Sequence, residues 1–378
     1  MSLPDTHVAI LGGGCAGLSL AVRLAERSIP AIVIEPRTAY SEDRTWSFWR
    51  DRPDPFEDCV RAHWSQWRVS HGTSTARRRS DRLRYETVSS RAVYDKALRL
   101  CASSSVEVLL GASVLGEPVF RVGGDFWETE TTSGSLQSRY LVDTRPRPAA
   151  GHYGQIFLGR ELAFPRAVFD TDEVGLMEFR RPRRDRVDFL YTLPFAPDRA
   201  LVEVTSFMRG ILETSGETSL ESWLDAEIDG LSGGMPCEMI REERGFIPML
   251  AKPLLTRARP EIRRADAGIR GGAARPSTGY AFQRIQRSAH IIAERIAAGH
   301  ETISVDLDTL GTRFMDRVFL RVIQRRPAAA PELFLKLFRN AGRDRLERFL
   351  SGSNAPLDRF AVVGALPPTP FLRELATP

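Results

Sequence analysis

The stretch VAILGGGCAGLSLAVRLAERSIPAIVIEPR, from Val8 to Arg37, carries the clearest indication of fold in this chain. A short apolar run over 7–11 predicts a buried parallel strand, and the run over 18–27 has the periodicity of a helix. A second apolar run covers 31–34. This order of strand, glycine turn, helix and strand is typical of the first βαβ unit of a dinucleotide-binding fold.

The residues between the first strand and the helix fit the pattern G-x-G-x-x-G, with Gly12, Gly14 and Gly17 at its glycine positions. The first glycine permits a tight turn, the second lets the backbone approach a pyrophosphate, and the third lets helix and strand pack closely. Glu35 ends the second strand, where an acid accepts hydrogen bonds from ribose hydroxyls. We predict a dinucleotide site here, with the choice between NAD and FAD left open by these residues.

Further strands follow along the chain. Residues 85–100 read as a loop that enters a helix, with Ser89 or Ser90 as the N-cap. A strand over 106–110 and an antiparallel excursion over 114–132 come next. The run over 140–143 predicts a strand that ends on Asp143, and the ends of parallel strands are where ligands bind.

The pattern changes after residue 154. Apolar runs at 156–158, 187–193 and 201–207 have no helices between them, which predicts an antiparallel sheet. A helix is expected over 219–229. A second glycine-rich segment, RGGAARPSTGYAFQ over 270–283, leads into a helix, and such a helix start suits the far end of a long cofactor.

The last part of the chain, from residue 306, reads as helical, and its richest linker is the Pro-containing stretch 327–331. A helix there carries apolar side chains beside arginines, as a helix lying on an anionic membrane surface does. Packing against the core explains the same pattern equally well. The apolar positions are Phe314, Val318, Phe319 and Val322.

Composition narrows the function further. The 378 residues carry a net charge of +5, but the arginines are scattered and no nucleic-acid-binding motif accompanies them, so we expect no nucleic acid partner. The four cysteines form no CxxC pair and no metal-ligand spacing, which favours the cytoplasm and no metal. No signal peptide or membrane-spanning run is expected.

Taken together, the segments of the chain resemble the bacterial flavoprotein lycopene cyclases. The resemblance covers nearly the whole length, and its specificity lies in the order and spacing of the matching stretches. These are ILGGGCAGLSLA, RTWSFW, YETVSSRAVYDKAL, YLVDTRP, GQIFLGREL, AVFDTDEVGLMEFR, FLYTLPFAPDRALVEVTSF and ARPSTGYAF.

This resemblance implies an α/β fold like that of the flavin hydroxylases and glutathione reductase. A Rossmann-type FAD-binding domain would comprise 1–60, 85–150 and 262–300. An antiparallel β-sheet substrate domain would comprise 61–84 and 151–261, and a helical region 301–378. It also implies that reduced FAD acts without net redox change, with NAD(P)H as a candidate reductant. The residues expected to hold FAD are Gly12, Gly14, Ala16, Gly17, Glu35, Pro36, Arg44, Thr45, Asp143, Gly271, Gly272, Pro276, Thr278 and Gly279.

The resemblance further implies that an acyclic polyene end is protonated, closes to a β-ionone-type ring and loses a proton. The family's essential acid lies in a motif similar to Leu201–Thr205, which assigns the proton donor to Glu203. Without the resemblance, strand alternation would place Glu203 in solvent. Glu178 is the reserve acid if the strand faces the other way. The expected substrate-binding aromatics are Trp46, Phe48, Trp49 and Tyr280.

Two departures and two rival functions accompany this hypothesis. Val204 stands where the family usually has a second acid, and Arg44 where it has histidine or asparagine. One rival is a redox flavoenzyme, either a monooxygenase or a polyprenyl reductase, although Gly271-Gly272 lacks the aspartate typical of hydroxylases. The other is a flavin-binding scaffold without chemistry.

Overall fold

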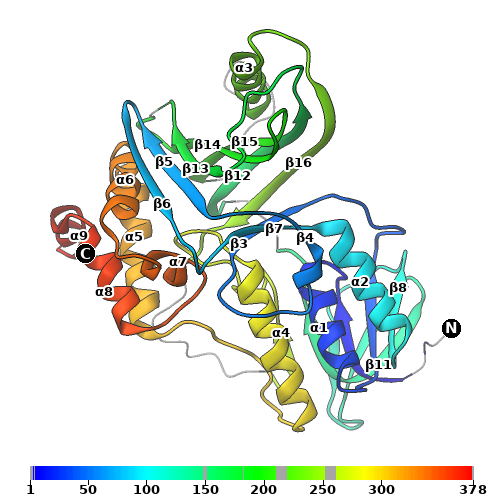
Figure 1. The fold of residues 1–378 in the computed structure, drawn as a ribbon. Helices are drawn as coiled ribbons and strands as arrows, with labels where there is room; N and C mark the ends of the chain where they lie inside the picture. Colours follow the sequence, from blue (N-terminus) through cyan, green and yellow to red (C-terminus); the bar gives the residue numbers. More distant parts are fainter. Residues whose placement is uncertain are drawn as a thin grey trace.

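The computed structural model describes residue 3 and residues 5–147, 151–181, 183–209, 219–251 and 261–376. The described chain forms two large sheets, a small sheet between them and a group of C-terminal helices (Figure 1). This architecture confirms the predicted α/β class, with a Rossmann-type sheet, an antiparallel sheet and C-terminal helices. The predicted division of the chain into three parts stays a prediction, and its boundary at residue 150 lies outside the described residues.

The first sheet contains the predicted Rossmann unit. In spatial order its strands are β8 (Val106–Leu110), β2 (Ala31–Glu35), β1 (Thr6–Leu11), β11 (Gly134–Asp143), β10 (Phe126–Thr131) and β9 (Val119–Arg121), and β17 (Arg264–Asp266) also pairs with β11. The helices packed on it are α1 (Cys15–Ala25), α2 (Ser90–Ala102) and α4 (Phe282–Ala297). The parallel core strands are almost fully buried because helices cover them, which explains their continuous apolar runs.

The second sheet is antiparallel apart from one parallel pair, β5 with β13. Its order is β16 (Glu238–Pro248), β12 (Tyr153–Ala163), β15 (Arg199–Arg209), β14 (Val187–Ala196), β13 (Glu173–Phe179), β5 (Gln66–His71) and β6 (Ser74–Arg79). Helix α3 (Leu220–Ser232) covers one face, which buries Val202 and Val204 against Trp223. The other face, which carries Leu201 and Phe207, packs against the C-terminal helices.

A small sheet of β3 (Thr45–Trp49), β7 (Tyr85–Ser89) and β4 (Val60–Trp64) connects the two large ones, and η1 (Glu57–Cys59) precedes β4. The prediction that the residues before α2 form a loop was wrong, because Tyr85–Ser89 pairs with strands on both sides. The predicted cap is confirmed: Ser89 Oγ accepts a hydrogen bond from the backbone N–H of Ala92.

The C-terminal helices lie at the left of Figure 1, beside β5 and β6. They are α5 (Leu310–Arg325), α6 (Ala330–Asn340), α7 (Arg345–Leu350), α8 (Pro356–Ala365) and α9 (Pro368–Leu375), with η2 (Pro327–Ala329) between α5 and α6. The expected linker at 327–331 was wrong, since Pro327 is buried and this stretch runs directly into α6. Pro at the start of a helical turn needs no N–H partner there.

Candidate active site

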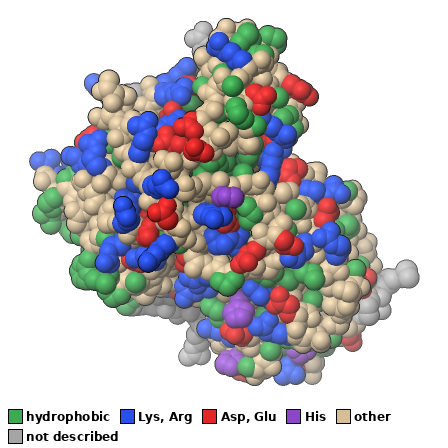
Figure 2. All heavy atoms as spheres, viewed as in Figure 1, with side chains coloured by type: hydrophobic (Ala, Val, Ile, Leu, Met, Phe, Trp, Pro, Cys, Tyr) green, Lys and Arg blue, Asp and Glu red, His purple; other side chains and the backbone are tan. Residues whose placement is uncertain are grey.

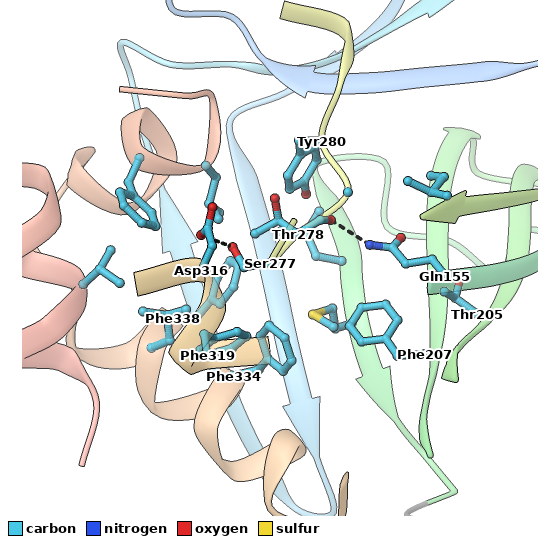
Figure 3. Close-up of a pocket in the computed structure, with 18 of the residues that line it drawn as sticks. Gln155, Thr205, Phe207, Ser277, Thr278, Tyr280, Asp316, Phe319, Phe334 and Phe338 are labelled. Carbon is cyan, nitrogen blue, oxygen red and sulfur yellow. Dashed lines mark hydrogen bonds between the residues drawn. The ribbon is translucent and has the colours of Figure 1, made fainter. Parts of the chain in front are cut away.

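A cavity of about 500 Å³ lies where the antiparallel sheet, the small sheet and the C-terminal helices meet. Its volume is within the range of small-molecule sites. In Figure 3, labelled side chains from the antiparallel sheet, from residues 277–280 and from the C-terminal helices border it. On the sheet side it is lined by Thr45, Trp46, Tyr85, Gln155, Phe157, Tyr191, Glu203, Phe207 and Glu243. On the helix side it is lined by Phe314, Phe319, Phe334, Phe338, Phe349 and Phe371.

Glu203 lies in the middle of β15, and its side chain lines the cavity rather than bulk solvent. Strand alternation places Glu203 on one face of the sheet and its neighbours Val202 and Val204 on the other. The face that carries Glu203 is covered by tyrosine side chains and by the helices across the cavity. The only side-chain hydrogen bond of Glu203 within the described chain comes from Thr205 Oγ1, which donates to Glu203 Oε1 over 2.9 Å.

The surroundings of Glu203 favour its neutral form. Burial raises its pKa to about 8, and the nearby carboxylate of Glu243 acts in the same direction. The Thr205 hydroxyl and the charge of Arg241 oppose this shift but do not cancel it. A carboxyl group in such a site holds its proton at neutral pH and is able to deliver it to a bound base or alkene.

Tyrosine rings surround the acid. Tyr191 is directly opposite Glu203 across the β14–β15 ladder, and its hydroxyl lies 2.9 Å from that of Tyr85. Tyr280 packs against Tyr85 edge to face, with ring centroids 6.5 Å apart. Burial raises the pKa of all three hydroxyls, so the rings stay neutral. The negative faces of neutral aromatic rings stabilise a nearby cation without attacking it.

Of the four aromatic residues predicted to bind substrate, the structure brings two to the cavity. Trp46 and Tyr280 line it. Phe48 stacks on Phe282 with ring centroids 4.6 Å apart, and Trp49 is almost fully buried beside Tyr85. Both therefore pack behind side chains that line the cavity, and do not line it themselves.

Glu178, the reserve acid, lies outside the cavity. It is buried on β13, where Arg68 donates to it over 2.8 Å and Arg180 over 2.9 Å. Glu178 is therefore a partner in two ion pairs and does not face the cavity.

Glu243 was missed in the sequence. It lies on β16, lines the cavity and is 4% exposed. It accepts hydrogen bonds from Arg241 Nη1 over 2.8 Å and from Thr45 Oγ1 over 2.9 Å. A hint was present, because the segment REERGFIP, 241–248, places charged residues in the region expected to form the antiparallel sheet. The strand pairing that brings Glu243 to the same face as Glu203 cannot be read from one sequence.

The glycine turn has the geometry that a pyrophosphate needs. Gly12 has φ of +96°, and a Cβ on Gly17 would lie 1.9 Å from the carbonyl oxygen of Gly12. A Cβ on Gly14 would meet only the end of the Arg37 side chain, at 3.9 Å, so space for a ligand lies over this glycine. Ala16, in the first turn of α1, faces Gly268, which lies two residues before the second glycine-rich segment, 270–283, here called the late segment.

Glu35, the last residue of β2, is hydrogen-bonded to the glycine turn. The backbone N–H of Gly13 donates to Glu35 Oε2 over 2.6 Å, and Arg37 Nε donates to Glu35 Oε1 over 2.8 Å. Although burial alone would raise it, these bonds hold the pKa of Glu35 below its ordinary value. Glu35 is therefore an ionised acceptor beside the glycine turn. Pro36 is exposed next to it.

Asp143 connects the two glycine segments rather than standing free. It is fully buried at the end of β11, where Arg145 contacts it over 2.8 Å and Arg270 over 3.3 Å. Gly271 must lack a side chain, since a Cβ would lie 2.3 Å from the Asp266 carbonyl oxygen. Gly272 follows with a positive φ of +77°.

The end of the late segment reaches the cavity. Thr278 and Gly279 line it, and Gln155 Nε2 donates to the Thr278 carbonyl oxygen over 2.8 Å (Figure 3). Pro276 is buried just before them. Arg44 and Thr45 line the same cavity from β3 and the residue preceding it. The predicted cofactor residues therefore fall into two groups, one at the glycine turn and one at the cavity wall.

Three comparisons with known proteins agree with this geometry. A family model described as "Lycopene cyclase protein" matches residues 7–376. A lycopene beta-cyclase of Pantoea ananas is 23% identical, and the alignment covers 98% of this chain and 97% of that protein.

Several solved structures share the fold. A geranylgeranyl bacteriochlorophyll reductase-like protein from Thermoplasma acidophilum superposes with a TM-score of 0.62 at 12% identity, covering 99% of this chain and 96% of its own. A flavoprotein/dehydrogenase from Cytophaga hutchinsonii superposes with a TM-score of 0.63 at 13% identity, covering 99% of both chains.

Proposed function

We propose, from the premise that this chain belongs to the lycopene cyclase family, that it is a flavin-dependent cyclase. Its substrate would be lycopene or a related polyene, whose acyclic end becomes a β-ionone-type ring. The single observation that carries this proposal is a carboxyl group, Glu203, that faces an aromatic cavity and whose pKa is raised by burial. A polyene has no leaving group, so cyclisation must begin with a proton from such an acid.

The chain's residues account for each requirement of that reaction. Glu203 would give its proton to a terminal carbon–carbon double bond, so an O–H bond breaks and a C–H bond forms. The next double bond attacks the resulting carbocation and the ring closes. The new cation then loses a proton, which returns to the Glu203 carboxylate. The product is an isomer of the substrate, so neither oxidant nor reductant is consumed.

The cavity lining suits a carbocation. The rings of Tyr85, Tyr191, Tyr280 and Trp46 offer π faces that stabilise positive charge, and the apolar wall keeps out water that would trap it. The rotamers of these rings are restrained by their neighbours, since Trp46 packs edge to face on Tyr94 and Tyr280 on Trp49.

The two groups of predicted cofactor residues fit FAD. Gly14 leaves open space for a pyrophosphate, and Glu35 is an ionised acceptor within reach of a ribose. The flavin end would lie near Thr278 and Gly279, which border the cavity that contains Glu203. Reduced FAD would supply an electron-rich ring system beside the developing cation. NAD(P)H is the proposed source of electrons for its initial reduction.

One experiment separates this proposal from its redox rivals. The purified protein is loaded with reduced FAD and given lycopene. The amount of cyclised end groups formed and the amount of NAD(P)H oxidised are then measured. Cyclised product without stoichiometric loss of NAD(P)H supports the cyclase. Oxidation of one NAD(P)H per turnover would instead indicate a reductase or a monooxygenase. Bound FAD without any product would indicate a flavin-binding scaffold without chemistry.

We also propose that the cavity opens onto a membrane surface. Its mouth is formed by side chains that are both exposed and cavity-lining. These are Phe314, Val363, Leu372 and Leu375. Leu357 and Phe360 extend the exposed apolar surface, which Figure 2 shows at the left edge of the molecule, over α8 and α9. A polyene dissolved in lipid would enter here without crossing water.

The proposed membrane contact differs from the one expected from the sequence, which lay on α5. Val318 and Val322 of α5 are buried, and Phe319 packs on Phe334, so this face of α5 points into the core. The apolar surface belongs mainly to α8 and α9 instead. Among the residues that the structure describes, no helix is long and apolar enough to cross a bilayer.

A further inference from the structure

Two carboxylates share one face of the antiparallel sheet. Gly159, at the centre of β12, is directly opposite Glu203 on one side and directly opposite Glu243 on the other. Residues that are directly opposite in a ladder project to the same face. Because Gly159 has no side chain, nothing from β12 separates the two acids, whose Cα atoms are roughly 10 Å apart, or twice the strand spacing.

The Glu203 side chain leans over this gap. A Cβ placed on Gly159 would lie 3.1 Å from Glu203 Cβ and 3.3 Å from Glu203 Oε2. The carboxyl group is therefore directed toward β12, the strand beyond which Glu243 lies.

The two acids have different partners. Glu243 forms an ion pair with Arg241 and accepts from the Thr45 hydroxyl, and Arg241 also donates to Thr45 Oγ1 over 2.6 Å. Glu203 has only the neutral hydroxyl of Thr205 and no ion pair within the described chain. When two neighbouring carboxyl groups compete, the one with the cation takes the charge and the other keeps its proton.

We propose that Glu243 is a positioning residue for the proton donor: its charge, held by Arg241 and Thr45, keeps Glu203 protonated before each turnover and favours the return of the proton afterwards. The inference rests on the proposed function for its catalytic meaning. Once Glu203 has donated, two anions face each other over Gly159, and taking a proton back from the ring cation relieves their repulsion. Glu243 thereby supplies a second acidic residue on the sheet face that lines the cavity. A side chain at position 204 cannot do so, because Val204 points toward α3.

The other titratable groups around Glu203 do not take this role. Tyr191 from β14, Tyr85 from β7 and Tyr280 from the late segment are kept neutral by burial. Arg241, from β16, acts in the opposite direction, and its charge is shared with Glu161. Arg44 lines the cavity but is exposed. Glu243 is the acid whose charge raises the pKa of Glu203.

The test is a titration of Glu203 in the parent and in three variants. Glu243→Gln keeps the shape and the Thr45 contact but removes the charge. Glu243→Asp keeps the charge. Glu242→Gln changes the next residue, which is exposed and paired with Arg160 on the other face of the sheet, and serves as the matched control. Infrared difference spectra identify the protonated carboxyl band of Glu203 by its absence in Glu203→Gln, and this readout needs no substrate.

The expected result is a fall in the Glu203 pKa of roughly one unit in Glu243→Gln, the ordinary scale for one neighbouring charge. The basic limb of the cyclase pH profile should move down by the same amount, with parental values in Glu243→Asp and Glu242→Gln. An unchanged Glu203 pKa in folded Glu243→Gln overturns the inference and leaves the proposed function standing. Loss of cyclisation in the parent would instead overturn the function.

Should Glu243→Gln fail to fold, the comparison is made in a background without Arg241, which itself acts on Glu203. Glu161 would keep Arg61 and Arg199 as partners in Arg241→Gln. The Glu203 pKa should be lower in the double variant Arg241→Gln with Glu243→Gln than in Arg241→Gln alone, and equal values would contradict the inference.

Discussion

Gly159 and Glu203 are in such close contact that a methyl group between them would touch the acid. A Cβ at position 159 would lie 3.1 Å from Glu203 Cβ and 3.3 Å from its Oε2, which is closer than most Cβ contacts in proteins. Gly159→Ala should therefore push the carboxyl group aside by a few tenths of an ångström. We expect about tenfold slower cyclisation, since misplacement of about 1 Å costs roughly a hundredfold.

The measurement for Gly159→Ala is single-turnover cyclisation, with FAD content as the check on folding. Gly230→Ala is the control, because the space around Gly230 of α3 is open and lies on the far side of the sheet. Parental turnover in Gly159→Ala would mean that the position of Glu203 does not limit the reaction.

Gly14→Val tests the pyrophosphate site. The extended backbone of Gly14, with φ of −74° and ψ of −168°, accepts valine, and only the flexible end of Arg37 lies near. The protein should fold, yet lose most of its affinity for FAD because the side chain fills the phosphate position. Equilibrium dialysis against FAD measures this, with Gly364→Ala, at an open position of α8, as the control. Unchanged affinity would place the cofactor elsewhere.

The raised pKa of Glu203 has a consequence for stability. The unfolded carboxyl titrates near 4.5 and the folded one near 8, so the folded protein binds this proton more tightly. The contribution is fully present below the unfolded pKa and is lost as the pH rises through about 8. Glu203→Gln cannot titrate, so the free energy of unfolding of the variant relative to the parent should increase between about pH 5 and about pH 9.

Urea denaturation of both proteins at the two pH values provides this measurement. Because all other titrating groups are shared, they cancel in the comparison. A difference in unfolding free energy that does not depend on pH would show that Glu203 has an ordinary pKa and is ionised in the folded protein.

The membrane proposal predicts a change that leaves the fold intact. Phe360 and Leu372 are 72% and 61% exposed, so Phe360→Asp with Leu372→Asp should not alter the core. The double variant should float poorly with liposomes and cyclise lycopene slowly in vesicles, but at the parental rate in detergent. Val122→Asp, at an 84% exposed site far along the chain in the Rossmann sheet region, is the control. Equal flotation of variant and parent would contradict the proposed mouth.

The local signals of the sequence predicted the parts of the fold that depend on neighbours in the chain. The glycine turn at Gly12–Gly17, the cap at Ser89 and the alternation around Glu203 all follow from such short-range rules. Alternation, however, says only that Glu203 and Val204 face opposite ways. Alternation does not reveal that the C-terminal helices, more than a hundred residues later in the chain, cover the sheet face that carries Glu203.

Long-range pairing explains what the sequence alone did not show. Residues 85–89 resemble a loop until their partners on β3 and β4 are known. Phe48 and Trp49 have the composition of a binding patch, but their neighbours Phe282 and Tyr85 make them part of the core. Glu243 could not be linked to Glu203 because their relation depends on the register of two ladders with β12.

The central claim is that Glu203 is the proton donor, and Glu203→Gln tests it most directly. The amide keeps the size and hydrogen-bonding capacity of the side chain but has no proton to transfer, so the variant should fold and bind FAD as the parent does. With reduced FAD and lycopene, cyclisation should fall at least roughly a hundredfold, the typical contribution of a general acid. Glu203→Asp should keep a trace, since its proton is displaced by about one methylene. A Glu203→Gln protein that cyclises lycopene at close to the parental rate would contradict the account.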